Sequence, residues 1–233
     1  SAASDVYKRQ VYNRSAHKSK KWHFEYGGEI AATPAEAADG ADFVMCCVGN
    51  DDDLREVTIG TNGAFSKIGK GSIFVDHTTV STRVTKELFD ISTDSGFDFI
   101  DAPISGGQAG AENGLLSIMC GGNQRAFTKV QPILKIYSKI CKRIGESGTG
   151  QQTKMCNQIA IAGLVQGLSE ALHFAEKAGL GGRDVVEVIS QGAAGSWQME
   201  NRYETMLDNN FDHGFAVDWM RKDLKICLET SDQ

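Results

Sequence analysis

The sequence predicts a doubly wound α/β sheet over residues 1–147, followed by an all-α domain over residues 148–233 that is entered through a long helix. Two observations lead to this prediction. In the first part, short and almost continuous apolar runs alternate with helical segments, which is typical of a mainly parallel sheet covered by helices on both faces. After the turn-rich segment 146–150, one long apolar helical stretch follows, and no clear strand comes after it.

Six apolar runs are expected to form the strands of the first domain. Runs of this kind are buried on both faces when neighbouring strands are parallel. Helix starts separate them, such as Thr33-Pro34-Ala35-Glu36, where Thr33 can cap the helix and Glu36 can complete a capping box. The expected strands are RQVYNR (9–14), DFVMCCVG (42–49), SIFVDHT (72–78), FDFIDAPI (97–104), LLSIMCGG (115–122) and KICKRIG (139–145).

The second domain is expected to begin with a buried helix. Thr149 and Gln152 have the spacing of a second capping box. From residue 151 to residue 178, apolar side chains fall on nearly every side of the helix, a pattern typical of burial all round. At about 1.5 Å per residue, such a helix is roughly 40 Å long. Gly179 is expected to end it.

Composition and charge restrict the class of protein. A formal net charge of -6 and a pI near 5.4 argue against nucleic acid or an anionic membrane as the partner. No segment has the length and apolar character of a transmembrane helix. The six cysteines form no CxxC pair, so we expect reduced, buried thiols, Cys156 among them, in a cytoplasmic protein. Asp51-Asp52-Asp53 precedes a helix and suits its dipole, so we expect no metal site there.

Lys154 is the strongest candidate for a catalytic residue. It lies near the start of the long helix, with Asn157 at i+3 and Gln158 at i+4 on the same face. A helix N-terminus disfavours cations, and burial disfavours the charged form further. We therefore expect a lowered pKa for Lys154, which suits a general acid/base near neutral pH. The alternative is an ordinary surface lysine.

Three segments carry a family resemblance. DAPISGGQAGAENGLLSIMCGG, GTGQQTKMCNQ and MRKDL occur in this order along the chain. Together they resemble the β-hydroxyacid dehydrogenase family, which includes 3-hydroxyisobutyrate dehydrogenase, tartronate semialdehyde reductase, and succinic or glyoxylic semialdehyde reductases. The resemblance covers about residues 11–228. It implies a Rossmann-like first domain and an enzyme that transfers a hydride between NAD(P) and the β-carbon of a small 3-hydroxyacid or semialdehyde.

The resemblance also implies roles in substrate binding and catalysis. Ser105, Gly106 and Gly107 would hold the substrate carboxylate, because two residues without side chains let an anion approach the backbone N–H groups closely. Lys154 would be the general acid/base, and Asn157 would fix the substrate oxygens. Sugar-acid phosphate relatives place His and Asn where Asn157 and Gln158 stand, which favours a small substrate here. For Gly110 and Gly114, relief of crowding in a tight turn is the preferred explanation.

For the cofactor, the resemblance implies contacts from several segments. The expected second strand of the family pattern ends in Asn13-Arg14-Ser15, which offers no carboxylate for a ribose. Arginine suits a 2′-phosphate, so NADP is favoured over NAD, with an ordinary polar turn as the alternative. Val48 in the following strand-end turn, Thr79, and Lys222 of Lys-Asp-Leu match further cofactor-binding positions. Asp223 would orient Lys222.

The family's first strand and its GxGxxG loop have no counterpart in this sequence. We therefore expect a chain truncated at both ends, with residues 1–10 a leader foreign to the fold. Such a chain would bind NADP or NAD weakly, and it would form a homo-oligomer when complete. A non-catalytic fragment or dinucleotide-binding module of the same fold remains the alternative.

Overall fold

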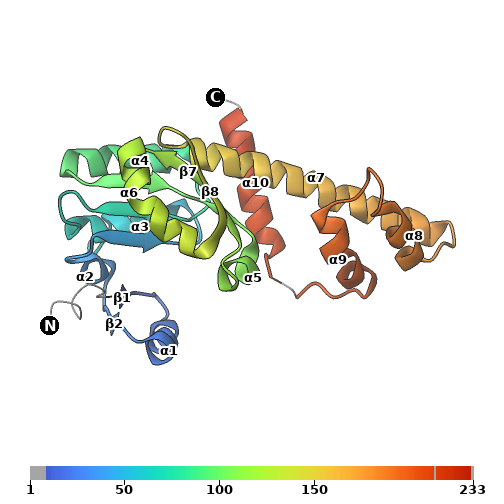
Figure 1. Cartoon of the computed structure of the whole chain (residues 1–233), viewed down its shortest axis with the longest axis horizontal. Helices are drawn as coiled ribbons and strands as arrows, with labels where there is room; N and C mark the ends of the chain where they lie inside the picture. Colours follow the sequence, from blue (N-terminus) through green and yellow to red (C-terminus); the bar gives the residue numbers. More distant parts are fainter. Residues whose placement is uncertain (1–8, 213, 232–233) are drawn as a thin grey trace. The chain divides into compact units, whose positions relative to one another are not determined.

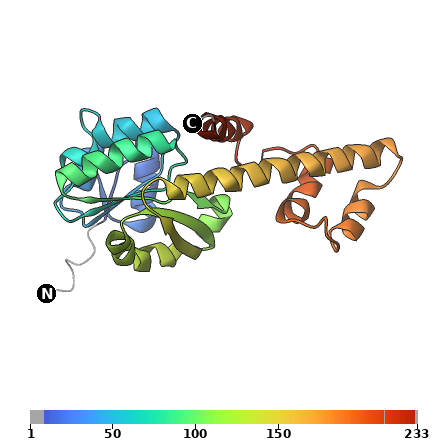
Figure 2. The same ribbon diagram turned by 90° about the horizontal axis from the view of Figure 1, so that it is seen from above.

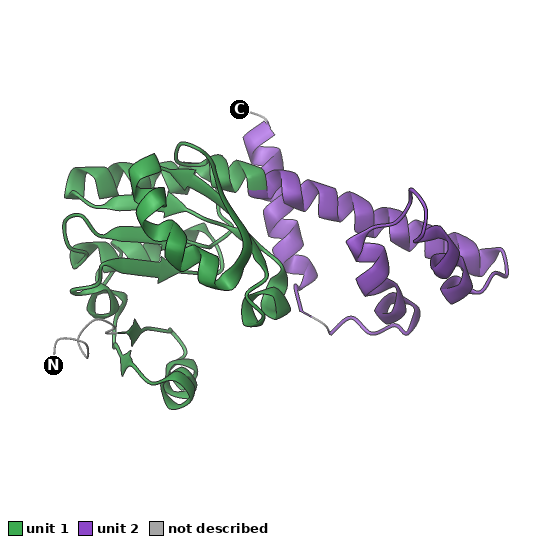
Figure 3. Ribbon diagram, viewed as in Figure 1, with its two compact units in different colours: residues 1–153 green, residues 154–233 purple. Residues whose placement is uncertain are grey.

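The computed structural model describes residues 9–212 and 214–231 (Figure 1). The chain forms two compact units, residues 1–153 (unit 1) and residues 154–233 (unit 2), shown in different colours in Figure 3. The expected leader, residues 1–10, lies outside the described residues except for Arg9 and Gln10.

Unit 1 contains a six-stranded mixed sheet. Its order is β3-β4-β5-β7-β6, with β8 beside β7. Strands β3, β4 and β5 are parallel, as expected, but β7 runs antiparallel to β5 and β6. The expectation of parallel strands is therefore wrong at β7, because the connection from β5 turns back through β6 and the short helix α5 (Gly107–Glu112). The strands are β3 (Phe43–Cys46), β4 (Ile73–Asp76), β5 (Asp98–Asp101), β6 (Ile104–Ser105), β7 (Leu116–Gly122) and β8 (Ser138–Gly145).

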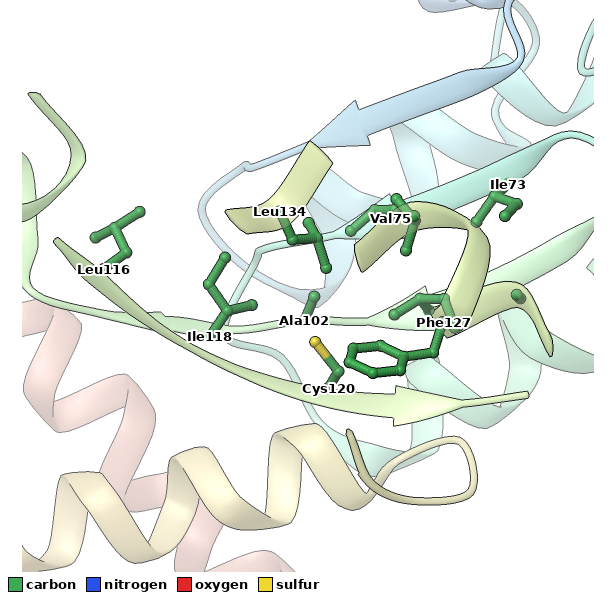
Figure 4. Packing of buried hydrophobic residues seen from close by; sticks show 11 residues of the cluster. Ile73, Val75, Ala102, Leu116, Ile118, Cys120, Phe127 and Leu134 are labelled. Carbon is green, nitrogen blue, oxygen red and sulfur yellow. The ribbon is translucent and has the colours of Figure 1, made fainter. Parts of the chain in front are cut away.

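Helices cover both faces of this sheet (Figure 2). On one face, α3 (Asp51–Ile59) and α4 (Thr82–Ser95) pack over a cluster that includes the stacked rings of Phe74 and Phe99. On the other face, α6 (Gln124–Leu134) contributes side chains to a second cluster. Figure 4 shows Phe127 and Leu134 of this helix among residues from the strands. The layered arrangement confirms the Rossmann-like α/β prediction for unit 1.

Polar side chains start several of these helices. Thr33 accepts the N–H of Glu36 at 3.1 Å and caps α2 (Pro34–Ala38). The Glu36 carboxylate accepts the N–H of Ala32 instead of that of Thr33, so the expected capping box forms only in its first half. Asn50 caps α3 by accepting the N–H of Asp53.

The first two strands lie apart from the main sheet. β1 (Gln10–Val11) pairs in parallel with β2 (Glu29–Ile30), and α1 (Ala16–Tyr26) connects them (Figure 1). β3 is at the edge of the six-stranded sheet, and no described strand lies between it and β1. The absence of a first strand and glycine loop that would join them stays a prediction.

The first turn of the long helix α7 (Thr149–Lys177) is fastened by Asp101, at the end of β5. The Asp101 carboxylate has no solvent exposure, and its two oxygens accept the N–H groups of Gly148 at 2.8 Å and Gln151 at 3.0 Å. Burial raises the pKa of Asp101, while these N–H groups oppose the rise. An acid from a distant strand thus caps this helix. The Thr149 hydroxyl donates to the Glu146 carbonyl, so the expected capping box is wrong.

Gln151 makes a second set of bonds from the same turn. Its side chain is fully buried; Nε2 donates to the Thr78 carbonyl at 2.7 Å, and Oε1 accepts the Val80 N–H at 3.2 Å. Both partners belong to the segment that follows β4. The start of α7 is therefore connected to the ends of two neighbouring parallel strands, β4 and β5.

Unit 2 is built from helices. α8 (Gly182–Ile189) and α9 (Trp197–Leu207) pack on α7 through Leu168, Leu172, Val186 and Met199, and α10 (Val217–Ser231) follows. This confirms the helical second part. Among the described residues, no helix is long and apolar enough to cross a membrane. The apolar residues of α7 are not buried all round, however, because the unit 2 helices cover only part of its circumference. Its exposed apolar residues include Ile159, Leu164 and Phe174.

We predict that Gly150→Ala destabilises the protein. A Cβ at Gly150 would lie 2.5 Å from the Met119 carbonyl oxygen and 2.7 Å from the Asp101 Oδ2, and a main-chain atom cannot move aside as a flexible side chain can. Overpacking of this kind costs about 1–3 kcal/mol. Chemical denaturation followed by circular dichroism measures the free energy of unfolding.

Gly163→Ala is the matched control on the same helix. A Cβ there meets no heavy atom within 4 Å, and alanine favours a helix interior by about 1 kcal/mol over glycine. The control should therefore be as stable as the wild type or more stable. Equal stability of the Gly150→Ala protein and the wild type would contradict the tight fit at the start of α7.

Candidate functional site

The Ser105-Gly106-Gly107 turn joins β6 to α5 in unit 1. Gly106 precedes α5 with φ 132°, and Gly107 has φ 63°, so both adopt conformations that favour glycine. A Cβ at Gly106 would also lie 3.1 Å from the Leu116 side chain, whereas a Cβ at Gly107 meets nothing within 4 Å. Both glycines are exposed. The turn therefore presents a bare backbone to solvent, and its role in substrate binding stays a prediction.

Two of the expected cofactor residues lie where neighbouring strands end. Val48 follows β3, and Thr79 follows β4; the two strands are parallel and in register from Phe43 to Cys46. The Val48 N–H donates to the Thr78 hydroxyl at 3.0 Å, which joins the two loops. Ligands of doubly wound sheets bind beyond the carboxyl ends of the strands, so the position of both residues suits a cofactor.

Asn13 and Arg14 follow β1. The Asn13 side chain accepts the N–H of Ser15 at 2.9 Å, which makes a polar turn. The Arg14 guanidinium is 83% exposed and forms an ion pair of 2.9 Å with Asp53, in the first turn of α3. Only one guanidinium nitrogen takes part in this ion pair, so Arg14 keeps further N–H donors for an anion.

In unit 2, the candidate residues of α7 and α10 form one buried polar cluster. Asn157 donates to the Gln158 side-chain oxygen at 2.7 Å, and Gln158 in turn donates to Asp223 at 2.6 Å. Lys222 forms an ion pair of 3.1 Å with Asp223, and its Nζ lies 5.6 Å from the centre of the Trp219 ring. Gln158 and Asp223 are 1% and 4% exposed, so both belong to the interior.

Lys154 belongs to the same cluster. It is only 7% exposed, and burial lowers its pKa to about 8. The positive charge of Lys222 adds to this decrease, and the negative charge of Asp223 opposes it. The expected direction of the pKa change is confirmed, and burial is its main cause. A lysine of this kind exchanges its proton readily close to neutral pH.

Sequence reasoning assigned no role to four buried polar residues around these segments. Asp101 and Gln151 fasten α7, and Gln158 links Asn157 to Asp223. Asp76 is fully buried at the end of β4; one of its oxygens lacks a hydrogen-bond partner in the described part of the chain, and burial raises its pKa to about 7. Each of these four residues is a polar residue inside an apolar or glycine-rich run of the sequence, and this pattern could have identified it.

Two other expectations concern residues outside these clusters. Cys47 and Cys156 are exposed, so the expected burial of the thiols is wrong for both. Asp51 accepts both the N–H and the hydroxyl of Ser81, and thereby connects the starts of α3 and α4. Among the described residues, no three His, Cys, Asp or Glu side chains form a group that could hold a metal ion.

Two family models match the chain. Residues 2–145 match the NAD-binding domain of 6-phosphogluconate dehydrogenase. Residues 148–233 match the NAD-binding domain of NADP-dependent 3-hydroxyisobutyrate dehydrogenase.

Individual relatives agree with the family models. An uncharacterized oxidoreductase of Shewanella frigidimarina is 55% identical over 219 residues, which cover 94% of this chain and 75% of the relative. The 2-hydroxy-3-oxopropionate reductase of Escherichia coli is 34% identical over 88% of this chain and 70% of its own length. A crystal structure of 3-hydroxyisobutyrate dehydrogenase from Salmonella typhimurium has a TM-score of 0.85 at 27% identity, covering 96% of this chain and 78% of that one.

The matched ranges extend over both units, and they include the turn at Ser105, the start of α7 and the Lys222-Asp223 pair of α10. The chain therefore belongs to the β-hydroxyacid dehydrogenase family of NAD(P)-dependent oxidoreductases.

Proposed function

We propose that the protein transfers a hydride between NADP or NAD and the β-carbon of a small 3-hydroxyacid or semialdehyde, with Lys154 as the general acid/base. The observation that carries this proposal is the burial of Lys154, together with its lowered pKa of about 8. When bound, the nicotinamide cofactor supplies hydride chemistry. The protein must then move a proton at the β-oxygen. In oxidation, the neutral amine of Lys154 takes the hydroxyl proton; in reduction, its ammonium returns it.

The residues beside Lys154 and the Ser105–Gly107 turn support this substrate class. The turn would bind the carboxylate through the Ser105 hydroxyl and the exposed N–H groups of Gly106 and Gly107. Asn157 would fix the substrate oxygens, with its side chain oriented by Gln158. The names of the Escherichia coli and Salmonella relatives support a small hydroxyacid or semialdehyde as the substrate.

Some of the cofactor contacts fit the residues present. Thr79 and Val48 lie at strand ends, and Arg14 offers an exposed guanidinium that suits the 2′-phosphate of NADP. Lys222 would contact the cofactor from α10 and be oriented by Asp223. The sequence contains no GxGxxG loop, so we assign no residue to the pyrophosphate.

Several expectations remain part of this proposal. They are a domain boundary between residues 147 and 148, a cytoplasmic location, no nucleic-acid or membrane partner, and assembly as a homo-oligomer. Exposed Ile159, Leu164 and Phe174 on α7 support assembly as a homo-oligomer, because apolar side chains on an exposed helix face favour association.

The alternative function is a non-catalytic dinucleotide-binding module, which would bind cofactor without turnover. An assay with a panel of hydroxyacids and both cofactors distinguishes this module from the proposed enzyme.

Lys154→Ala should lower kcat by at least about 10²-fold, the scale for loss of a general acid/base. In the wild type, the oxidation rate should rise with pH through about 8, because the neutral amine is the base and forms as pH rises through its pKa. This limb of the pH profile should disappear in the variant. Steady-state kinetics from pH 6 to pH 10 (roughly two pH units either side of that pKa) test it, and near wild-type turnover of the variant would rule out the mechanism.

Arg14→Ala should weaken NADP binding by about 1–3 kcal/mol, the value of a charge-assisted hydrogen bond, and leave NAD binding nearly unchanged. Calorimetric titration of the two cofactors measures the difference. Lys18→Ala, an exposed cation on the neighbouring α1, controls for the loss of one positive charge. Equal losses for both cofactors, or none, would mean that Asn13-Arg14-Ser15 is only a turn.

A further inference from the structure

The side chain of Gln151 connects two segments that the proposed function uses for different purposes. Its amide bonds to the Thr78 carbonyl and the Val80 N–H, the two backbone groups on either side of Thr79. Thr79 is the residue proposed to contact the cofactor. Gln151 itself lies one helical turn before Lys154 on α7, so a shift of the Gln151 backbone moves the Lys154 backbone with it.

We infer that Gln151 is a positioning residue. It keeps residues 78–80, called the Thr79 segment below and proposed to contact the cofactor, in a fixed relation to the helix turn that leads to Lys154. Asp101 assists by holding the backbone of the same turn. The inference rests on the proposed function of Lys154 and Thr79, and it assigns to Gln151 and Asp101 no direct contact with substrate or cofactor.

The geometry leaves Gln151 little freedom. Its backbone N–H is held by Asp101 Oδ2, while both polar atoms of its side chain are held by the Thr79 segment. Gln151 and Asp101 are 0% exposed, so water cannot replace a bond that is lost. Gly150 allows the close approach, since a Cβ there would overlap Asp101.

A simple helix cap does not account for this arrangement. Ser or Thr before a helix caps it with one local bond, as Thr33 does for α2. At α7, the two Asp101 bonds already satisfy N–H groups of the first turn, and the Gln151 side chain satisfies none of them. Its bonds serve only the Thr79 segment. Transfer of a proton and a hydride on one substrate requires both groups at the correct distance, and a misplacement of about 1 Å can reduce the rate about 10²-fold.

The test replaces Gln151 by methionine, which keeps the length of the side chain and removes both bonds. Gln152→Met is the matched control, because Gln152 is exposed on the same turn. In the full chain, Gln151→Met should lower kcat about 10- to 100-fold with a much smaller change in the KM of the substrate, and should move the pH limb assigned to Lys154. The control should keep wild-type kcat and pH profile. Hydrogen exchange should become faster at Val80 in the Gln151→Met protein only.

The result that would overturn the inference is a folded Gln151→Met protein with wild-type kcat and pH profile, whatever its melting temperature. If methionine prevents folding, Gln151→Glu keeps the acceptor for Val80 and loses the donor to Thr78; wild-type kcat in that variant would overturn the inference equally. Lys154→Ala separates this result from failure of the proposed function. An active Lys154→Ala protein refutes the proposed acid/base role of Lys154, on which the inference rests, whereas an inactive one beside a normal Gln151→Met protein refutes only the positioning role.

Discussion

A buried carboxylate at the end of β5 accepts two N–H groups from the first turn of α7, and the candidate site depends on this contact. The first turn of a helix has N–H groups without partners inside the helix, and it carries a partial positive charge. The Asp101 carboxylate, which is buried, accepts two of these N–H groups and lies close to the partial positive charge. The same electrostatics explain why an acid is tolerated in the interior: the N–H groups stabilise the ionised form that burial disfavours.

The contact also explains the glycines around it. A Cβ at Gly121 would lie 2.6 Å from the Asp101 carboxylate, and one at Gly150 would lie 2.7 Å from it. Neither position accepts a side chain without displacement of β7 or of the helix start. Close packing of strand, carboxylate and helix turn thus restricts the sequence at three separate points, although only the aspartate carries a charge.

Much of the fold could be predicted from local sequence. The apolar runs locate β3, β4, β5, β7 and β8. β4 and β5 are buried almost throughout, as a strand covered on both faces requires, whereas β8 leaves Ile140 and Ile144 exposed. The long helix follows from the lack of a proline or a glycine pair between the turn-rich segment 146–150 and Gly179, and α7 ends at Lys177. The lowered pKa of Lys154 could be expected in direction from burial, but its relation to Lys222 and Asp223 could not, since these residues lie on another helix.

Other features depend on contacts that sequence patterns do not specify. The bond from Asp101 to Gln151 joins residues 50 positions apart, and its donor is a backbone N–H that nearly every residue has. The antiparallel β7 depends on a turn back through β6, which no apolar run distinguishes from a crossover. Apolar residues on nearly every side of α7 predicted burial all round, but a sequence pattern does not identify the residues that would cover each side. In the structure, Cys156 and Phe174 are exposed.

Lys154 can move the substrate proton near neutral pH only if it has the proton affinity of a general acid/base. Nuclear magnetic resonance of protein with carbon-13 at the lysine ε-carbons, assigned by comparison with Lys154→Arg, measures the pKa of Lys154 directly. We predict a midpoint of about 8 for this residue. A midpoint near 10.4, the ordinary value for lysine, would contradict it.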